Sequence, residues 1–252
     1  MKLSPQEKAD RRAAFHRMSV PEKLEYILAY YKLPIVLVLI ALIFLGTVIS
    51  HAATRKNHLL FLGFVNVSVG EDLEARLTDR FLEAAGADPK RNDVYTYTGL
   101  YLSDHPAEEN HEYSYASKLK ILAAINARQM DLVLLNREAY DICSHSGYLL
   151  DLSELLQQRG APELYGLAAS FLSENEVVLS DNAIEMELGT ADAYRADVET
   201  SVNGLEVSGL PAFQTAEFQE PVFLCVIANS PRLSEILDYM GYILSVDFDP
   251  EG

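Results

Sequence analysis

The sequence predicts an α/β domain with a mixed sheet, preceded by an N-terminal transmembrane helix. Three observations indicate this fold class. An uncharged run of 18 residues occupies positions 33–50. Between residues 59 and 156, strand-like and helix-like apolar patterns alternate, which favours at least some parallel strand pairing. Residues 163–220 contain shorter segments and turn signals, typical of antiparallel strands laid against such a core.

The uncharged run, LPIVLVLIALIFLGTVIS, is just long enough to cross a hydrocarbon core of roughly 30 Å, and residues 51–53 can extend it. Seven Lys and Arg residues precede it and two follow closely, so the tail should be cytoplasmic. Ser50-His51-Ala52 resembles a signal-peptidase site, but the basic region is long and the apolar run exceeds that of a signal peptide. An uncleaved signal anchor is therefore favoured over a cleaved signal peptide.

Three segments are expected: a cytoplasmic basic tail (1–32), a transmembrane helix (33–53) and an extracytoplasmic α/β domain (57–252). The chain would be a single-pass protein of the cell membrane. Its net charge is −17, and residues 57–252 alone carry 11 basic and 33 acidic side chains, a net charge of −22. Such a domain repels nucleic acid and anionic lipid, so no nucleic-acid partner is expected. The acidic surface serves either solubility or cationic partners.

The elements of the outer domain are predicted in chain order. Residues 59–69 are apolar and β-branched and predict a strand; 93–102 and 131–135 predict two more. Two helices lie between these strands, the first ending at Gly86. The residues predicted on their buried faces are Leu73, Leu77, Phe81 and Ala84 in the first helix, and Ala116, Leu119, Leu122 and Ile125 in the second.

The later part of the chain is less regular. Asn203-Gly204 is a hairpin-turn signal, and Glu185 and Glu187 are expected on the solvated face of a strand. Residues 222–228 predict a buried strand, followed by a helix that Asn229 caps and Pro231 begins. The residues of this helix predicted to face inward are Leu233, Ile236, Leu237, Met240 and Leu244.

The chain lacks motifs for nucleotide binding, nucleophilic hydrolysis and metalloprotease chemistry, so no enzymatic activity, cofactor or metal is expected. His105 and His111 lie in an acidic segment with Glu108, Glu109 and Glu112, but their irregular spacing favours a solvated loop over a metal site. Cys143 and Cys225 lie in apolar segments and are expected to be two buried thiols or, outside the cytosol, one disulfide.

Small polar residues lie at the ends of three of the predicted strands. They are Asn66 with Ser68, Asn136, and Asn229. Ligands of open α/β sheets bind beyond the carboxyl ends of strands, where asparagine can donate and accept hydrogen bonds. The alternative is that each asparagine caps its own helix or turn. These four residues are the candidate ligand-binding positions.

The segment around residues 131–152 resembles a known family. Asp131-Leu132-Val133-Leu134-Leu135-Asn136, a short helix, and Gly147-Tyr148-Leu149-Leu150-Asp151-Leu152 are similar to the cleft strand and following turn of extracellular solute-binding proteins of ABC importers. The segment 222–242 is similar to a later strand, turn and helix of that type 2 periplasmic-binding-protein fold. The resemblance implies that Asn136 and Asn229 lie near the cleft.

The chain also departs from this family. Its outer domain is short for two lobes, it has no tryptophan, and a membrane helix replaces the lipid-anchored cysteine. The resemblance therefore implies a reduced, membrane-anchored domain that binds a small solute, or a partner such as an ABC transporter subunit or another membrane protein. The alternative is an interaction or structural membrane protein in which the same fold binds no ligand.

Overall fold

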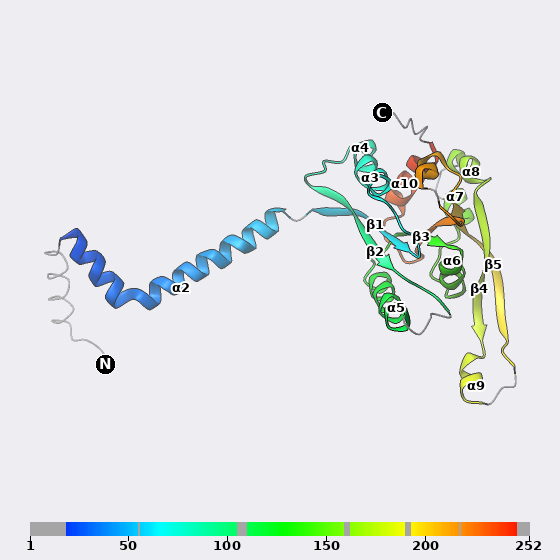
Figure 1. Ribbon diagram of the computed structural model, residues 1–252. Coiled ribbons are helices and arrows are strands. Elements are labelled where there is room, and N and C mark those ends of the chain that lie inside the picture. Colours follow the sequence, from blue (N-terminus) through cyan, green and yellow to red (C-terminus); the bar gives the residue numbers. More distant parts are fainter. Residues whose placement is uncertain are drawn as a thin grey trace. The chain divides into compact units, whose positions relative to one another are not determined.

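The computed structural model describes residues 19–54, 56–104, 110–158, 162–189, 193–216 and 218–245 (Figure 1). The chain divides into two compact units, residues 1–55 and 56–252. The expected cytoplasmic tail lies outside the described residues for most of its length, up to residue 18.

The described part of the first unit is a long helix, α2 (Val20–Thr54). Ser19 precedes it, and Glu22 in its first turn reaches back to Ser19: Glu22 Oε2 accepts from the Ser19 backbone N–H and from its hydroxyl, each at 2.8 Å. The large apolar side chains described between residues 33 and 45 are exposed, and Leu33 is the most exposed of them at 77%. Within the residues that the structure describes, no helix is both long and apolar enough to cross a membrane. The membrane helix expected over 33–53 includes side chains, at 35 and 48–53, that lie outside the described ones, and its insertion stays a prediction.

In the second unit, the described residues form a six-stranded mixed sheet of order β2-β1-β3-β6-β5-β4 (Figure 1). Its strands are β1 (Asn57–Val65), β2 (Asn92–Leu100), β3 (Leu132–Asn136), β4 (Leu172–Asp181), β5 (Ala196–Glu206) and β6 (Val222–Val226). β1 is parallel to β2 and to β3, whereas β6 is antiparallel to both β3 and β5, and β5 to β4. The predicted α/β class with a mixed sheet is confirmed.

Helices cover both faces of the sheet. Alternate residues of β3 enter two separate cores, Leu132 and Leu134 on one face and Val133 and Leu135 on the other. The first face is covered by α3 (Glu71–Leu77), α4 (Asp79–Ala84), α7 (Leu152–Gln158), α8 (Pro162–Ala168), the 3₁₀ helix η2 (Pro211–Ala216) and α10 (Leu233–Ser245). The second face is covered by α5 (His111–Asn126) and α6 (Arg137–His145). β3 is therefore buried on both sides, which explains its continuous apolar sequence.

The first predicted helix is divided in two at Thr78. The backbone of Thr78 leaves the helical region (φ −120°, ψ −77°), and its hydroxyl donates to the Glu74 carbonyl at 2.7 Å. Leu73, Leu77 and Phe81 are buried as predicted. Ala84 is exposed, because the break at Thr78 changes which residues of α4 lie on the same face as the buried residues of α3. Gly86 ends the segment with φ +65°, as its predicted role requires.

The buried face of α5 differs from the predicted one. Of the four residues predicted to be buried, Ile125 is buried, Leu122 is half-buried, and Ala116 and Leu119 are exposed. The buried residues of α5 are Ser114, Ser117, Ile121, Ala124 and Ile125. Ile121 packs on the sheet, and the positions four and seven residues before it are serines. Small polar residues thus form the buried face over two turns of the helix. A search for apolar residues at helical spacing does not detect such a face.

The region between residues 172 and 206 also corrects the prediction. Asn203-Gly204 is not a turn but lies inside β5, where both residues are buried. The hairpin instead turns at α9 (Ala183–Glu187), so Glu185 and Glu187 lie on a helix and not on a strand. At the C-terminus, α10 begins at Leu233, two residues after the predicted start at Pro231.

Candidate functional site

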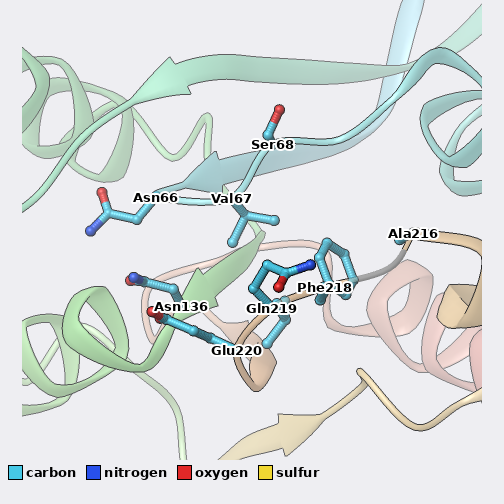
Figure 2. Close-up of a pocket in the computed structure, with 9 residues that line it drawn as sticks. Asn66, Val67, Ser68, Asn136, Ala216, Phe218, Gln219 and Glu220 are labelled. Atoms are coloured by element: carbon cyan, nitrogen blue, oxygen red, sulfur yellow. The ribbon is translucent and has the colours of Figure 1, made fainter.

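A pocket of about 490 Å³ lies at one end of the sheet, beyond the carboxyl ends of β1 and β3 (Figure 2). Three of the four predicted ligand residues, Asn66, Ser68 and Asn136, line it. They converge because β1 and β3 are parallel with Val65 opposite Leu135, so that the residues after each strand meet at one edge.

Asn66 has a structural role at the pocket, because its side-chain amide is already hydrogen-bonded. Its backbone has φ +57°, a conformation that asparagine tolerates better than most side chains. Its amide pairs with the backbone of Leu102: Nδ2 donates to the carbonyl at 2.6 Å, and Oδ1 accepts from the N–H at 2.8 Å. Asn66 thereby prolongs the β1–β2 pairing by one side-chain bridge and turns the chain so that Val67 and Ser68 reach the pocket.

Asn136 is the N-cap of α6. Its Oδ1 accepts a hydrogen bond from the backbone N–H of Ala139 at 3.0 Å, as in the capping alternative considered from the sequence. In the part of the chain that the structure describes, this is the hydrogen bond that the Asn136 side chain makes. Nδ2 therefore remains able to donate to a ligand in the pocket.

The other wall of the pocket was not predicted. It comes from the segment that leads into β6 and comprises Ala216, Phe218, Gln219, Glu220 and Val222. Among the described residues that line the pocket, Glu220 is the ionisable one, and it is exposed. This segment has no strand or helix periodicity, so only the turn signal of Pro221 marks it in the sequence.

Asn229 does not join the other three residues. β6 is antiparallel to β3, with Val222 opposite Asn136 and Val226 opposite Leu132, so the end of β6 lies where β3 begins. Asn229 is therefore at the opposite edge of the sheet, where its Nδ2 donates to the Ile125 carbonyl at 2.8 Å. The expectation that Asn229 lies near the same cleft is wrong, because it assumed that its strand ran parallel to β3.

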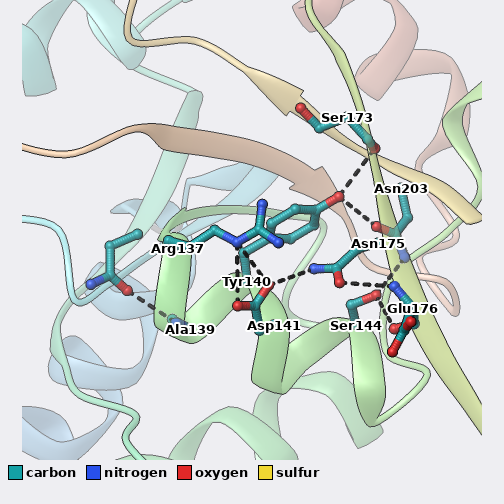
Figure 3. Close-up of polar contacts among 10 residues, drawn as sticks. Arg137, Ala139, Tyr140, Asp141, Ser144, Ser173, Asn175, Glu176 and Asn203 are labelled. Carbon is teal, nitrogen blue, oxygen red and sulfur yellow. Dashed lines mark hydrogen bonds and ion pairs between the residues drawn. The ribbon is translucent and has the colours of Figure 1, made fainter.

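Behind the pocket, a polar network ties α6 to β4 and β5 (Figure 3). The Tyr140 hydroxyl donates to Asn203 Oδ1 at 2.8 Å, and Asn203 Nδ2 donates to Ser144 Oγ at 2.8 Å. Ser144 Oγ donates in turn to the Glu176 carbonyl at 2.8 Å. Burial raises the pKa of Tyr140, so this phenol is a permanent donor at neutral pH. The network fixes α6, and with it the Asn136 cap.

Asp151, in the segment that carries the family resemblance, also has a structural role. Its carboxylate accepts hydrogen bonds from Ser153 Oγ and the Glu154 N–H at the start of α7, and from Ser201 Oγ and the Val202 N–H in β5. Burial acts to raise the pKa of Asp151, but these four hydrogen bonds outweigh it and the pKa lies below its ordinary value. Asp151 thus joins α7 to β5 as a carboxylate.

The groups suited to metal binding or nucleophilic chemistry are scattered or buried. Among the described residues, no cluster of His, Cys, Asp and Glu could hold a metal ion. His105, Glu108 and Glu109 lie outside the described residues, and His111 begins α5. Cys143 and Cys225 are free, buried thiols. Burial raises the pKa of Cys143 to about 12, so it is protonated at neutral pH and is no nucleophile.

No protein-family model matches this chain, and no curated protein matches it.

Proposed function

We propose that this protein is a membrane-anchored, extracytoplasmic α/β domain that binds a small polar solute in the pocket between β1, β3 and the segment before β6. The observation that carries this proposal is the convergence of Asn66, Ser68 and Asn136 on one pocket. These residues were selected from the sequence only because each lies at the end of a predicted strand. Their meeting at a hollow edge is the arrangement in which open α/β sheets bind ligands.

The lining defines the class of solute. The Asn136 amide can donate a hydrogen bond, Ser68 and Gln219 add polar side chains to the lining, and Phe218 offers an apolar ring. Glu220 is the charged group among the described residues of the lining, so an anionic solute would be repelled. The pocket therefore suits a neutral or cationic polar molecule, such as a sugar, an amino acid, a short peptide or a polyamine.

The proposed anchor is α2. Its apolar segment contains no charged residue, the side chains described there are exposed, and basic residues are concentrated before it. Protease added to intact cells should then remove residues 57–252 while the N-terminal tail is retained. Full protection of the outer domain would contradict the proposed topology.

The resemblance to solute-binding proteins of ABC importers supports the same function. Parallel strands β1, β2 and β3 alternate with helices in the order that the resemblance implies. In place of a second lobe, β4 and β5 extend as a hairpin that ends in the five-residue helix α9. We infer a reduced, one-lobe binding domain, which leaves a bound solute accessible to a partner such as a transporter subunit.

Thermal denaturation of the full chain in detergent micelles, with sugars, amino acids, short peptides and polyamines as separate arms, tests this function. A solute of one class should raise the melting temperature. The Glu220→Gln variant then separates the ligand classes, because it should weaken a cationic solute and leave a neutral one unchanged. If no class raises the melting temperature, the solute-binding function is contradicted.

A second function, an interaction domain without a solute, is favoured by one observation. The hairpin formed by β4 and β5 exposes apolar side chains that the domain itself leaves uncovered. This surface is separate from the pocket and does not depend on it.

A further inference from the structure

β4 and β5 form an arm, defined here as residues 174–201, that extends past the rest of the sheet and carries α9 at its end (Figure 1). β5 pairs with β6 only at Leu205 and Glu206, whereas its pairing with β4 continues to Ala196. Beyond the α6 network, the described part of the arm is therefore a two-stranded ribbon. Such a ribbon is only marginally stable on its own, so covering it would stabilise it.

The end of the arm is apolar and exposed. Among its described residues, α9 buries no side chain. Ile184 and Leu188 are 70% and 72% exposed. The other large apolar side chains exposed along the arm are Leu179, Met186, Tyr194 and Val198. Several large exposed apolar side chains on one projecting element favour contact with another molecule.

Side-chain hydrogen bonds join the two strands of the arm where they meet α9. The Asn182 side chain bridges its two halves: Nδ2 donates to the Ala193 carbonyl at 2.9 Å, and Oδ1 accepts from the Arg195 N–H at 2.7 Å. The Tyr194 hydroxyl donates to Asp181 Oδ2 at 3.1 Å. Because these contacts hold the two strands together next to α9, docking there would require less ordering of the ribbon.

The charge of the arm selects among partners. Residues 174–201 contain eight acidic side chains and one basic side chain, Arg195, a net charge of −7. Two such arms would repel each other, which disfavours a second copy of this chain. An anionic lipid surface is disfavoured for the same reason. A basic surface that also presents apolar side chains is complementary to both properties of the arm.

We propose that the end of this arm, with Ile184 and Leu188 as its apolar contacts, docks a basic, amphipathic segment of a partner protein. The acidic side chains along the ribbon attract the segment and orient it, and the apolar side chains of α9 and its neighbours are buried on docking. Charge then accelerates association, while the buried apolar area sets the lifetime of the complex.

The test uses the full chain in nanodiscs of zwitterionic lipid and a short labelled peptide of alternating lysine and leucine, with binding to empty nanodiscs subtracted. We expect saturable binding that weakens with salt. Replacing both apolar contacts (Ile184→Ser with Leu188→Ser) should weaken it about tenfold, although the protein's charge is unchanged. Leu119→Ser, which removes a comparable exposed leucine from α5, is the matched control and should have no effect. Equal binding by the double variant would overturn the proposal.

A single tryptophan distinguishes the alternative occupants. The chain contains no tryptophan, so Leu188→Trp places one reporter at the end of the arm. Its emission should shift to the blue when the lysine–leucine peptide is added. A blue shift on adding lipid vesicles instead would assign the surface to a membrane. A blue shift that depends on the concentration of the protein itself would assign it to a second copy of the chain. Either result would overturn the proposal.

Discussion

Gly204 lies against the Tyr140 side chain so closely that a Cβ at position 204 would be 2.6 Å from the tyrosine hydroxyl oxygen. Tyr140 is fully buried, stacks on Phe223 with ring centroids 4.5 Å apart, and donates to Asn203. The ring cannot retreat without breaking these contacts. Gly204 is therefore required for the close approach of α6 to β5, and not for a turn.

Gly204→Ala should accordingly destabilise the fold by about 1–3 kcal/mol, the usual cost of overpacking a core. Urea denaturation followed by circular dichroism measures this change in the free energy of unfolding. Gly166→Ala is the matched control: Gly166 lies in α8, where an added Cβ would meet no atom within 4 Å, so that variant should be as stable as the native protein or slightly more stable. Similar stabilities for both variants would contradict this account of Gly204.

Asp131 should contribute strongly to stability. Its carboxylate is fully buried and accepts from the Phe61 N–H at 2.8 Å, Ser230 Oγ at 2.6 Å and Arg232 at 3.1 Å, joining β1 and β3 to the turn before α10. Asp131→Ala leaves these donors without their acceptor and should cost about 3–5 kcal/mol in the free energy of unfolding. Arg91→Ala removes a solvent-exposed ion pair with Asp88 and should change stability by less than about 1 kcal/mol.

The hydrogen bonds to Asp151 predict a pH dependence. Because its folded-state pKa lies below the ordinary value, the ionised group adds stability above the unfolded-state pKa, and this contribution is lost as the pH falls through the folded-state pKa. The native protein should therefore be more stable than Asp151→Asn at neutral pH, and the difference should shrink on acidification below about pH 4. A difference that stayed constant over this range would show that the carboxylate's charge is irrelevant.

Much of the fold follows from the sequence because buried strands and amphipathic helices carry their own periodicity. β1, β3 and β6 are continuous apolar runs, and the residues after β1 and β3 were predictable pocket residues for that reason. Strand direction is not encoded in such a run. Asn229 was therefore assigned to the pocket edge, whereas the antiparallel β6 places it at the opposite edge.

Other errors arose where long-range contacts override local patterns. Asn203-Gly204 has the composition of a turn, but Tyr140 and Ser144, about 60 residues away in sequence, hold it inside a strand. Glu220 and Phe218 could not be predicted as pocket residues, since only the position of β6 beside β3 brings their segment to the end of β1.

Asn136 should affect stability through its cap alone. Asn136→Ala removes the acceptor for the Ala139 N–H and should cost about 1 kcal/mol, whereas Asn136→Ser retains a capping oxygen and should cost little. Thermal denaturation of the two variants in the absence of solute measures this. If the two variants were equally destabilised, the hydrogen bond to Ala139 would not be the source of the effect.

Because Asn136→Ser preserves the cap and removes the amide donor, it also separates folding from binding. The most direct test of the proposed function is isothermal titration of the solute identified by thermal denaturation into the native protein, Asn136→Ser and the control Asn229→Ser, whose site lies at the opposite edge of the sheet. The account predicts binding by the native protein and by Asn229→Ser, and about tenfold weaker binding by Asn136→Ser. Undiminished binding by Asn136→Ser would contradict a solute site between β1 and β3.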